Sequence, residues 1–250
     1  MKRKKIGIFG FKLGESSFGM TLPYIRLFEY FGDVVILTPS SPIDTELDLL
    51  VVPGGPDINP SRYDASYIDY SVNRADPIRE FFDEKHLPEY ITHGVPVFGI
   101  CRGFQSIAVL EGIPLVQNMY HETSIDVNKR GEMVHSLNIP YDFKTNMVGF
   151  FDNKDNINYR NLIDRPKLTN NTFKVNSLHH QSLVRDVKRI ADRFEILASY
   201  LGKFDDAVEA IEHKTLPIAG VQWHPEELFI SGNIDPISIY LINKLLNSKK

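Results

Sequence analysis

Short apolar runs that alternate with amphipathic segments constrain the fold of this chain more strongly than any other feature. In the first half these runs are KIGIFG (5–10), DVVILT (33–38), LDLLVVPGG (47–55) and VPVFGI (95–100). Continuous apolar strands are typical of parallel sheets that are buried on both faces. Segments with helical spacing lie at 22–32, at 76–94, where Pro88 interrupts the pattern, and at 104–112. This alternation predicts an α/β fold with a central, mostly parallel sheet covered by helices.

The second half of the sequence has a different pattern, in which β-type segments follow one another through short turns. These segments are 132–139, 193–201, 206–213 and 216–224, and a helix is predicted at 235–249. We therefore expect additional β-segments in the C-terminal half. The polar, Asn-rich stretch 144–174 is interpreted as a loop excursion rather than a linker, so that residues 1–250 are expected to form a single domain.

Charge and cysteine content exclude several classes of protein. The chain carries 28 basic and 32 acidic residues, a net charge of -4, whereas nucleic-acid-binding proteins usually have clustered basic residues. The basic start, residues 1–5, is interpreted as a solvated leader, and no apolar run approaches the roughly 18–20 residues of a membrane span. The single cysteine, Cys101, excludes an internal disulfide and favours a reducing compartment. We expect a cytoplasmic protein that binds neither nucleic acid nor membrane.

Cys101 lies in VPVFGICRGFQSIAVL, where an apolar run gives way to a helical pattern. Gly99 and Gly103 flank it two residues away on each side, which is the G-x-Cys-x-G form of a nucleophile elbow. In such a turn the helix N-terminus favours thiolate, and the N–H of Arg102 points toward a developing oxyanion. The alternative is a small buried core residue between incidental glycines. We predict that Cys101 is a nucleophile.

A thiol nucleophile needs a base, and His224 is the histidine with the clearest local orienting group. It lies in GVQWHPEE, where an apolar strand delivers it and rigid Pro225 follows. In an extended segment residues i and i+2 point to the same side, so Glu226 can accept from Nδ1–H and leave Nε2 for the thiol. A surface His-Pro-Glu turn is the alternative, but each motif supplies what the other lacks.

The stretch VVPGGPDINPSRY provides a candidate second backbone donor. Glycines after a strand allow the backbone to approach a ligand closely. Gly55 can therefore offer an N–H to the oxyanion, whereas Pro56 has no N–H. An ordinary strand-end turn is the alternative interpretation.

The motifs PGGPD, GICRGFQ and GVQWHPE together resemble those of the class I glutamine amidotransferase superfamily, in the same order along the chain. The resemblance implies a flavodoxin-like three-layer α/β sandwich and a triad of Cys101, His224 and Glu226. It also implies that the backbone amides of Gly55 and Arg102 form the oxyanion hole. Within the superfamily, GGPDINPSRY and VNSLHHQS are similar to the gamma-glutamyl hydrolase branch, which includes gamma-glutamyl-gamma-aminobutyrate hydrolases.

This resemblance predicts hydrolysis of small gamma-glutamyl amides through a glutamyl-thioester, with no cofactor and no metal. The free α-amino and α-carboxylate groups of the glutamyl substrate need polar partners. The candidates are Gly54, Gln105, Ser177, His179 and Gln181. They make the substrate side of the predicted site.

Three functional hypotheses remain open. The first is a stand-alone gamma-glutamyl hydrolase, and the second is a glutaminase subunit that acts on glutamine and supplies ammonia to a separate synthetase or ligase chain. The third is a non-catalytic binding module, which the intact Cys-His-Glu set disfavours. Two side-chain roles are also open: Arg102 could recognise charge or be structural, and the pair His179 and His180 could bind substrate or form a polar turn.

Overall fold

The computed structural model of the protein describes most of the chain. The described residues are 3–14, 16–63, 68–69, 72, 75–119, 130–133, 135–153, 171–183, 187–201 and 206–248. Within these ranges, no helix has both the length and the apolar character that crossing a membrane requires.

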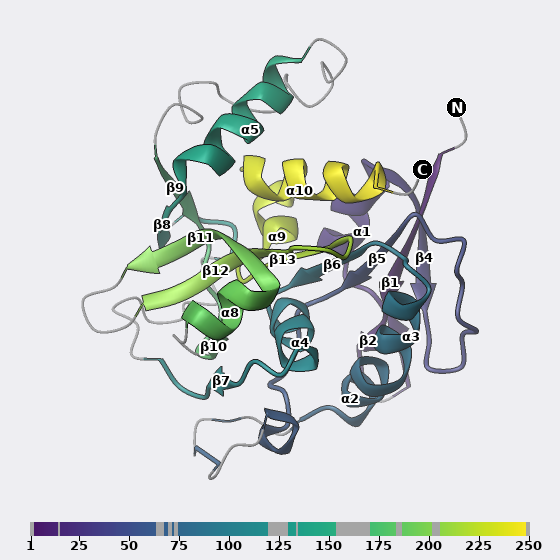
Figure 1. The fold of residues 1–250 in the computed structure, drawn as a ribbon. Helices are drawn as coiled ribbons and strands as arrows, with labels where there is room; N and C mark the ends of the chain where they lie inside the picture. The colour runs from purple at the N-terminus through teal and green to yellow at the C-terminus, as the bar shows by residue number, and fades with distance from the viewer. Residues whose placement is uncertain are drawn as a thin grey trace.

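The strands of the two halves join in one nine-stranded sheet (Figure 1). Five neighbouring strands are parallel: β4 (Gly32–Leu37), β1 (Lys4–Phe9), β5 (Leu49–Val52), β6 (Val97–Ile100) and β13 (Ile218–Val221). Four antiparallel strands extend the sheet beyond β13: β12 (Asp206–His213), β11 (Phe194–Leu201), β8 (His135–Asn138) and β9 (Thr172–Val175). Two small ribbons pair β2 (Phe11–Lys12) with β3 (Phe18–Gly19) and β7 (Leu115–Val116) with β10 (Ser182–Leu183).

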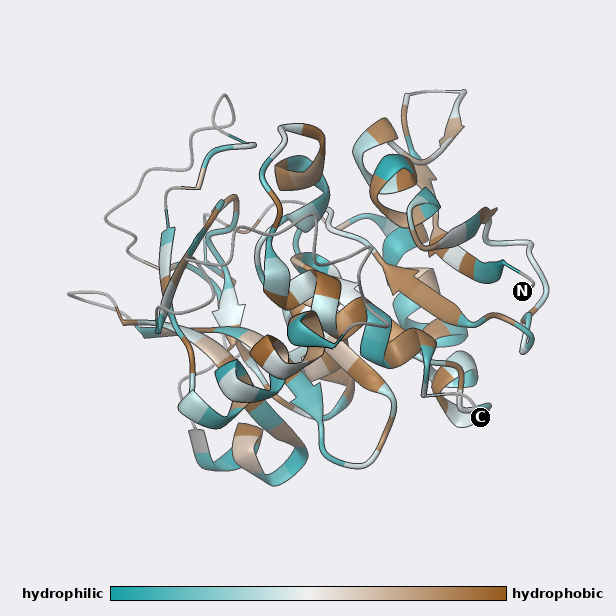
Figure 2. Ribbon diagram, turned by 90° about the horizontal axis from the view of Figure 1, so that it is seen from above, coloured by the Kyte–Doolittle hydropathy of each residue, from teal (hydrophilic) through white to brown (hydrophobic). Residues whose placement is uncertain are grey.

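Helices cover both faces of the sheet, and each face has its own apolar core. One face carries α1 (Leu22–Glu29), α5 (Tyr141–Asp152), α9 (Pro225–Ile230) and α10 (Pro236–Leu246). The other carries α2 (Pro77–Phe81), α3 (Leu87–Thr92), α4 (Arg102–Leu110) and α8 (Val187–Arg193), and a short 3-10 helix, η1 (Pro60–Tyr63), follows the β5 turn. Helices are banded in hydropathy because one side packs and the other meets solvent (Figure 2). The predicted three-layer α/β sandwich is confirmed.

Strand β5 explains why the runs are apolar without interruption. Leu49 and Val51 pack into one core, Leu50 and Val52 pack into the other, and all four are fully buried. Successive side chains of a strand point to opposite faces, so a strand covered on both faces needs apolar residues at every position.

The segment predicted as a helix at 76–94 forms a continuous helical path with a change of pitch. Between α2 and α3, the stretch η2 (Phe82–His86) is π-helical. Pro88 is the second residue of α3, so the wider π-helical turn comes directly before the residue whose missing N–H interrupts regular α-helical hydrogen bonding. This is how the chain accommodates the residue that interrupted the pattern.

Other expectations are wrong in detail. The helix predicted at 22–32 ends earlier, because α1 ends at Glu29 and Gly32 begins β4, where a side chain would overlap the carbonyl oxygen of Lys4. The first residue of α1, Leu22, is 58% exposed, whereas Tyr24 is buried. The stretch 144–174 is not loop at its ends, because α5 covers its start and β9 its end, while 154–170 lies outside the described residues.

Candidate active site

Cys101 occupies a sharp turn between β6 and α4. Its φ of 51° and ψ of -107° make it the single non-glycine residue with positive φ in the described part of the chain. Such a conformation costs roughly 1–3 kcal/mol and persists only when the surroundings enforce it. The N–H of Cys101 donates to the carbonyl of Val221 at 2.8 Å, so the pairing of β6 with β13 continues into the turn. The elbow predicted from the sequence is present.

The flanking glycines are needed for close backbone approach. A side chain on Gly103 would overlap the carbonyl oxygen of Val52 in β5. A Cβ on Gly99 would lie 2.7 Å from the carbonyl group of Gly103. Both glycines have negative φ, so packing rather than backbone conformation excludes a side chain. The start of α4 can therefore lie directly against β5 and β6.

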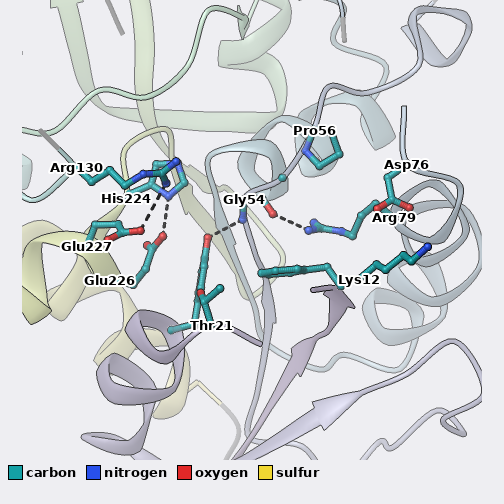
Figure 3. A pocket seen from close by; sticks show the side chains of 13 residues that line it. Lys12, Thr21, Gly54, Pro56, Asp76, Arg79, Arg130, His224, Glu226 and Glu227 are labelled. Carbon is teal, nitrogen blue, oxygen red and sulfur yellow. Dashed lines mark hydrogen bonds and ion pairs between the residues drawn. The ribbon is translucent and has the colours of Figure 1, made fainter. Parts of the chain in front are cut away.

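His224 and Glu226 form the predicted pair, though not on an extended segment. His224 is the residue before α9, and Glu226 lies in the first turn of that helix. The His224 Nδ1 atom is 2.6 Å from Oε1 of Glu226 (Figure 3). A carboxylate only accepts, so Nδ1 carries the proton of this hydrogen bond and Nε2 is left for another partner. The side chain of Glu226 is 1% exposed.

Asn176 fixes the backbone of His224, and it was not among the site residues predicted from the sequence. Its Oδ1 accepts from the N–H of His224 at 2.9 Å, and its Nδ2 donates to the carbonyl of His224 at 3.0 Å. Asn176 lies inside the VNSLHHQS motif, so its motif membership was the signal that could have identified it.

The imidazole of His224 and the thiol of Cys101 meet beside Gly54. A Cβ built on Gly54 would lie 2.7 Å from Cε1 of His224 and 3.6 Å from Cβ of Cys101. Burial alone would lower the pKa of His224. The carboxylate of Glu226 and the sulfur of Cys101 outweigh it and raise that pKa well above its usual range. The arrangement favours the protonated, imidazolium form of His224.

The turn after β5 is held by two residues that have no local sequence signal. The N–H of Gly54 donates to the hydroxyl of Tyr24 at 2.8 Å. Arg79 donates to the carbonyls of Pro53 and Gly54, each at 2.6 Å. Burial raises the pKa of Tyr24 well above its usual range, and the nearby carboxylate of Glu226 raises it further. The sequence shows a polar side chain in a helical segment in each case, but not which backbone groups that side chain contacts.

The side chain of Arg102 is structural. It is 1% exposed, it donates to Asp83 through Nη1, and its Nη2 lies 2.7 Å from Oε1 of Glu80. The guanidinium therefore ties α4 to the α2–η2 segment and does not face a substrate. Arg102 is the first residue of α4, where a backbone N–H has no helical acceptor.

A chain of buried amides connects the sulfur to the VNSLHHQS segment. Gln105 donates through Nε2 to the backbone carbonyl of Gln181 at 3.0 Å and to Oε1 of Gln222 at 3.1 Å. Because a carbonyl only accepts, this fixes the NH2 group of Gln105 and turns the NH2 group of Gln222 toward Cys101, whose sulfur lies 3.6 Å away. Gln222, in GVQWHPE, was missed as a contact of the thiol.

The remaining substrate candidates lie near this network in different ways. His179 is buried, with Nδ1 2.9 Å from the carbonyl of Gln181 and Nε2 3.6 Å from Glu209. Ser177 is half-buried, whereas the side chain of Gln181 is almost fully buried. His179 therefore belongs to a buried cluster and not to a solvated polar turn. Across the described residues no group of three or more His, Cys, Asp or Glu side chains has the arrangement of a metal site.

A cavity of about 260 Å³ opens beside His224 (Figure 3). Its charged or titratable lining residues are Lys12, Tyr24, Asp76, Arg79, Arg130, His224, Glu226 and Glu227, and the others are Phe11, Thr21, Gly54, Gly55 and Pro56. Of the predicted substrate residues, Gly54 is the one in this lining. The cavity therefore lies on the His224 and Gly55 side of the site, away from Gln105 and His179.

Known proteins resemble this chain in sequence and in fold. The family model described as Peptidase C26 matches residues 27–226. A glutamine amidotransferase-like protein of Rickettsia prowazekii is 27% identical over 249 residues, covering 88% of this chain and 85% of that protein. A glutamine-hydrolyzing GMP synthase subunit of Methanocaldococcus jannaschii is 26% identical over 196 residues, covering 76% of this chain and 71% of that protein. A solved glutamine amidotransferase of Thermotoga maritima has the same fold, with a TM-score of 0.54, 15% identity and coverage of 99% of this chain and 100% of that chain.

Proposed function

Since the chain belongs to the Peptidase C26 family, we propose that it hydrolyses the gamma-glutamyl amide bond of small gamma-glutamyl compounds through a glutamyl-thioester. One observation carries the proposal. Cys101 in its strained turn, His224 and Glu226 meet at the carboxyl edge of the parallel strands, although they come from separate parts of the sequence. We further propose that residues 1–250 act as one domain.

In the proposed reaction, the thiolate of Cys101 attacks the γ-carbonyl carbon. The N–H groups of Gly55 and Arg102 stabilise the oxyanion of the tetrahedral intermediate, and one such donor is worth about 3–4 kcal/mol. His224 gives its proton to the leaving amine as the C–N bond breaks, which leaves a thioester on Cys101. His224 then takes a proton from water, which attacks the thioester and releases glutamate and the free thiol. Glu226 holds the imidazole throughout.

The cavity beside His224 supports a leaving group larger than ammonia. The departing amine takes its proton from His224, and His224 is one of the residues that line the cavity. A water molecule has a share of about 30 Å³ in the liquid, so a cavity of about 260 Å³ accommodates several non-hydrogen atoms. We place the leaving amine there and the glutamyl group on the side of Gln105, Ser177, His179 and Gln181, with Gly54 between the two.

A glutaminase subunit is the second candidate, and the similarity to a GMP synthase subunit favours it. In that case the substrate is glutamine, and a separate synthetase or ligase chain receives the ammonia. The triad chemistry is the same, so the leaving group and the effect of a partner distinguish the two.

The test is incubation of the pure protein with a panel of gamma-glutamyl amines and with glutamine, following released glutamate. Turnover of the amines well above that of glutamine supports the hydrolase. Slow glutaminase activity that rises when a synthetase is added supports the glutaminase role. Cys101→Ala should abolish turnover with the fold intact, and retained turnover in that variant would remove the mechanism.

A further inference from the structure

We propose that Arg79 is a positioning residue for the oxyanion hole. Its guanidinium holds the peptide between Gly54 and Gly55 so that the N–H of Gly55 faces the side of the nucleophile. The inference rests on the proposed function in one respect, which is that the N–H of Gly55 stabilises the oxyanion. Arg79 lies in α2, outside the three motifs, and touches neither Cys101 nor His224 among the contacts described above.

The contacts of Arg79 are directed at two successive peptide groups. Nη2 donates to the carbonyl of Pro53 and Nη1 donates to the carbonyl of Gly54, both at 2.6 Å, and the side chain is fully buried. Burial, aided by the neighbouring Arg102, lowers the pKa of Arg79 to about 10, so it is still a cation at neutral pH. Charge-assisted hydrogen bonds from a planar fork are strong and fix orientation. Figure 3 shows Arg79 and His224 on opposite sides of Gly54.

The orientation of the Gly55 N–H follows from peptide geometry. In a planar trans peptide the C=O and N–H groups point in opposite directions. Because Arg79 draws the carbonyl of Gly54 toward α2, the N–H of Gly55 must point away from α2. Cβ of Cys101 lies 3.6 Å from the Cβ position of Gly54, so the nucleophile is next to this peptide.

The neighbouring residues leave Gly55 as the donor of this turn. The N–H of Gly54 is already bonded to the hydroxyl of Tyr24, and Pro56 has no N–H. The Gly54–Gly55 peptide lies between two residues without side chains, so little steric resistance opposes its rotation. A rotated peptide would turn a carbonyl oxygen toward the developing oxyanion. The glycine pair cannot prevent this rotation, whereas Arg79 does so by its hydrogen bond to the carbonyl of Gly54.

The experiment compares two reactions of Cys101 in the same variants. Alkylation by iodoacetamide needs a reactive sulfur but forms no oxyanion. Acylation by p-nitrophenyl acetate passes through a tetrahedral oxyanion and needs no recognition of a glutamyl group. Rates with Cys101→Ala are subtracted as background. The variants are Arg79→Met, Arg79→Lys and, as a matched control, Arg62→Met.

Arg62 is a suitable control because it is also mostly buried and contacts Glu80 and Asp83, the two carboxylates that bind Arg102. It lies 3.4 Å from Glu80 and 3.3 Å from Asp83, and its side chain is 12% exposed. No contact joins it to Pro53 or Gly54 in the interactions described for the chain, so its loss tests the removal of a buried cation by itself.

We expect Arg79→Met to lower the acylation rate by about 10²-fold, in line with loss of one oxyanion donor, and to leave alkylation within about twofold. Arg79→Lys should recover part of the acylation rate, and Arg62→Met should change neither rate. Equal loss of both reactions in Arg79→Met, or no loss of acylation, would overturn the proposal. If the wild type is acylated in an Arg79-dependent way but hydrolyses no gamma-glutamyl compound, the proposed function fails and this inference stands.

Discussion

The substitution Gly54→Ala tests the meeting of thiol and imidazole most directly. The new Cβ would lie 2.7 Å from Cε1 of His224, whereas ordinary contact begins at 3.4 Å. The ring must therefore move by about 0.7 Å (3.4 minus 2.7), because Cβ is fixed to the backbone. His224 cannot shift freely, since Glu226 holds its ring at 2.6 Å and Asn176 holds its backbone. The φ of Gly54 is not positive, so alanine fits the backbone conformation.

A displacement of about 1 Å in a catalytic group can cost about 10²-fold in rate, which corresponds to about 2.7 kcal/mol in the activation barrier. We expect kcat/KM of Gly54→Ala to fall by about 10- to 100-fold with gamma-glutamyl amides. Alkylation of Cys101 by iodoacetamide should also slow, because the imidazolium moves away from the sulfur.

The matched control is Gly149→Ala in α5. No atom lies within 4 Å of a Cβ built there, so alanine should stabilise the helix by about 0.5–1 kcal/mol and leave turnover unchanged. Thermal melts of both variants distinguish a loss of folding from a displacement of the His224 ring in a folded protein. A folded Gly54→Ala protein with wild-type turnover and wild-type alkylation would refute the argument that the imidazole and thiol meet at this glycine.

Three further predictions follow from the same contacts. Glu226→Gln removes a negative neighbour and should lower the pKa of His224, as measured by NMR titration of its ring. In the wild type that pKa is raised, so the stability that His224 contributes is complete below about pH 6.5 and is lost as the pH rises through the pKa of the folded state. In the variant the lower pKa should move this loss to lower pH. Gln222→Leu removes the N–H donor near the sulfur and should slow iodoacetamide labelling of Cys101 several-fold, without a loss of helix content by circular dichroism, whereas unchanged labelling would contradict the contact. Gly103→Ala should lower the free energy of unfolding by about 3 kcal/mol or prevent folding, since its Cβ would overlap a backbone oxygen of β5; a urea midpoint equal to that of the wild type would show that α4 can move away.

The sequence predicts the layers of this fold well because the signal is local. Each position of β5 faces an apolar core, so the run of apolar residues carries the burial of both faces. Long-range pairing carries no such signal. Strand β13 lies between β6 and β12 and runs parallel to β6 and antiparallel to β12. This placement depends on side-chain packing across the whole sheet.

The same difference between local and long-range signals separates the site residues that were predicted from those that were not. Cys101 and His224 could be predicted as site residues because their proposed roles depend on nearby glycines and on a carboxylate two residues away. Tyr24 and Arg79 act on a turn that is distant in the sequence, and a tyrosine or arginine in an amphipathic helix has no local mark of its target. The π-helical stretch before α3 shows the same limit, since Pro88 marks a break but not how the backbone absorbs it.

The place of β13 in the sheet has a consequence for the order in which the protein can become reactive. Among the strands of this sheet, β13 comes last in the sequence, yet it lies between β6 and β12. Gln222, just after it, contacts a sulfur that was synthesised 121 positions earlier. During synthesis Cys101 would therefore wait for the base and the amide donor that we propose for it until β13 and the residues just after it are made. Insertion of this one strand joins β6 to β12 and, in the proposed mechanism, brings both groups to the sulfur at the same time.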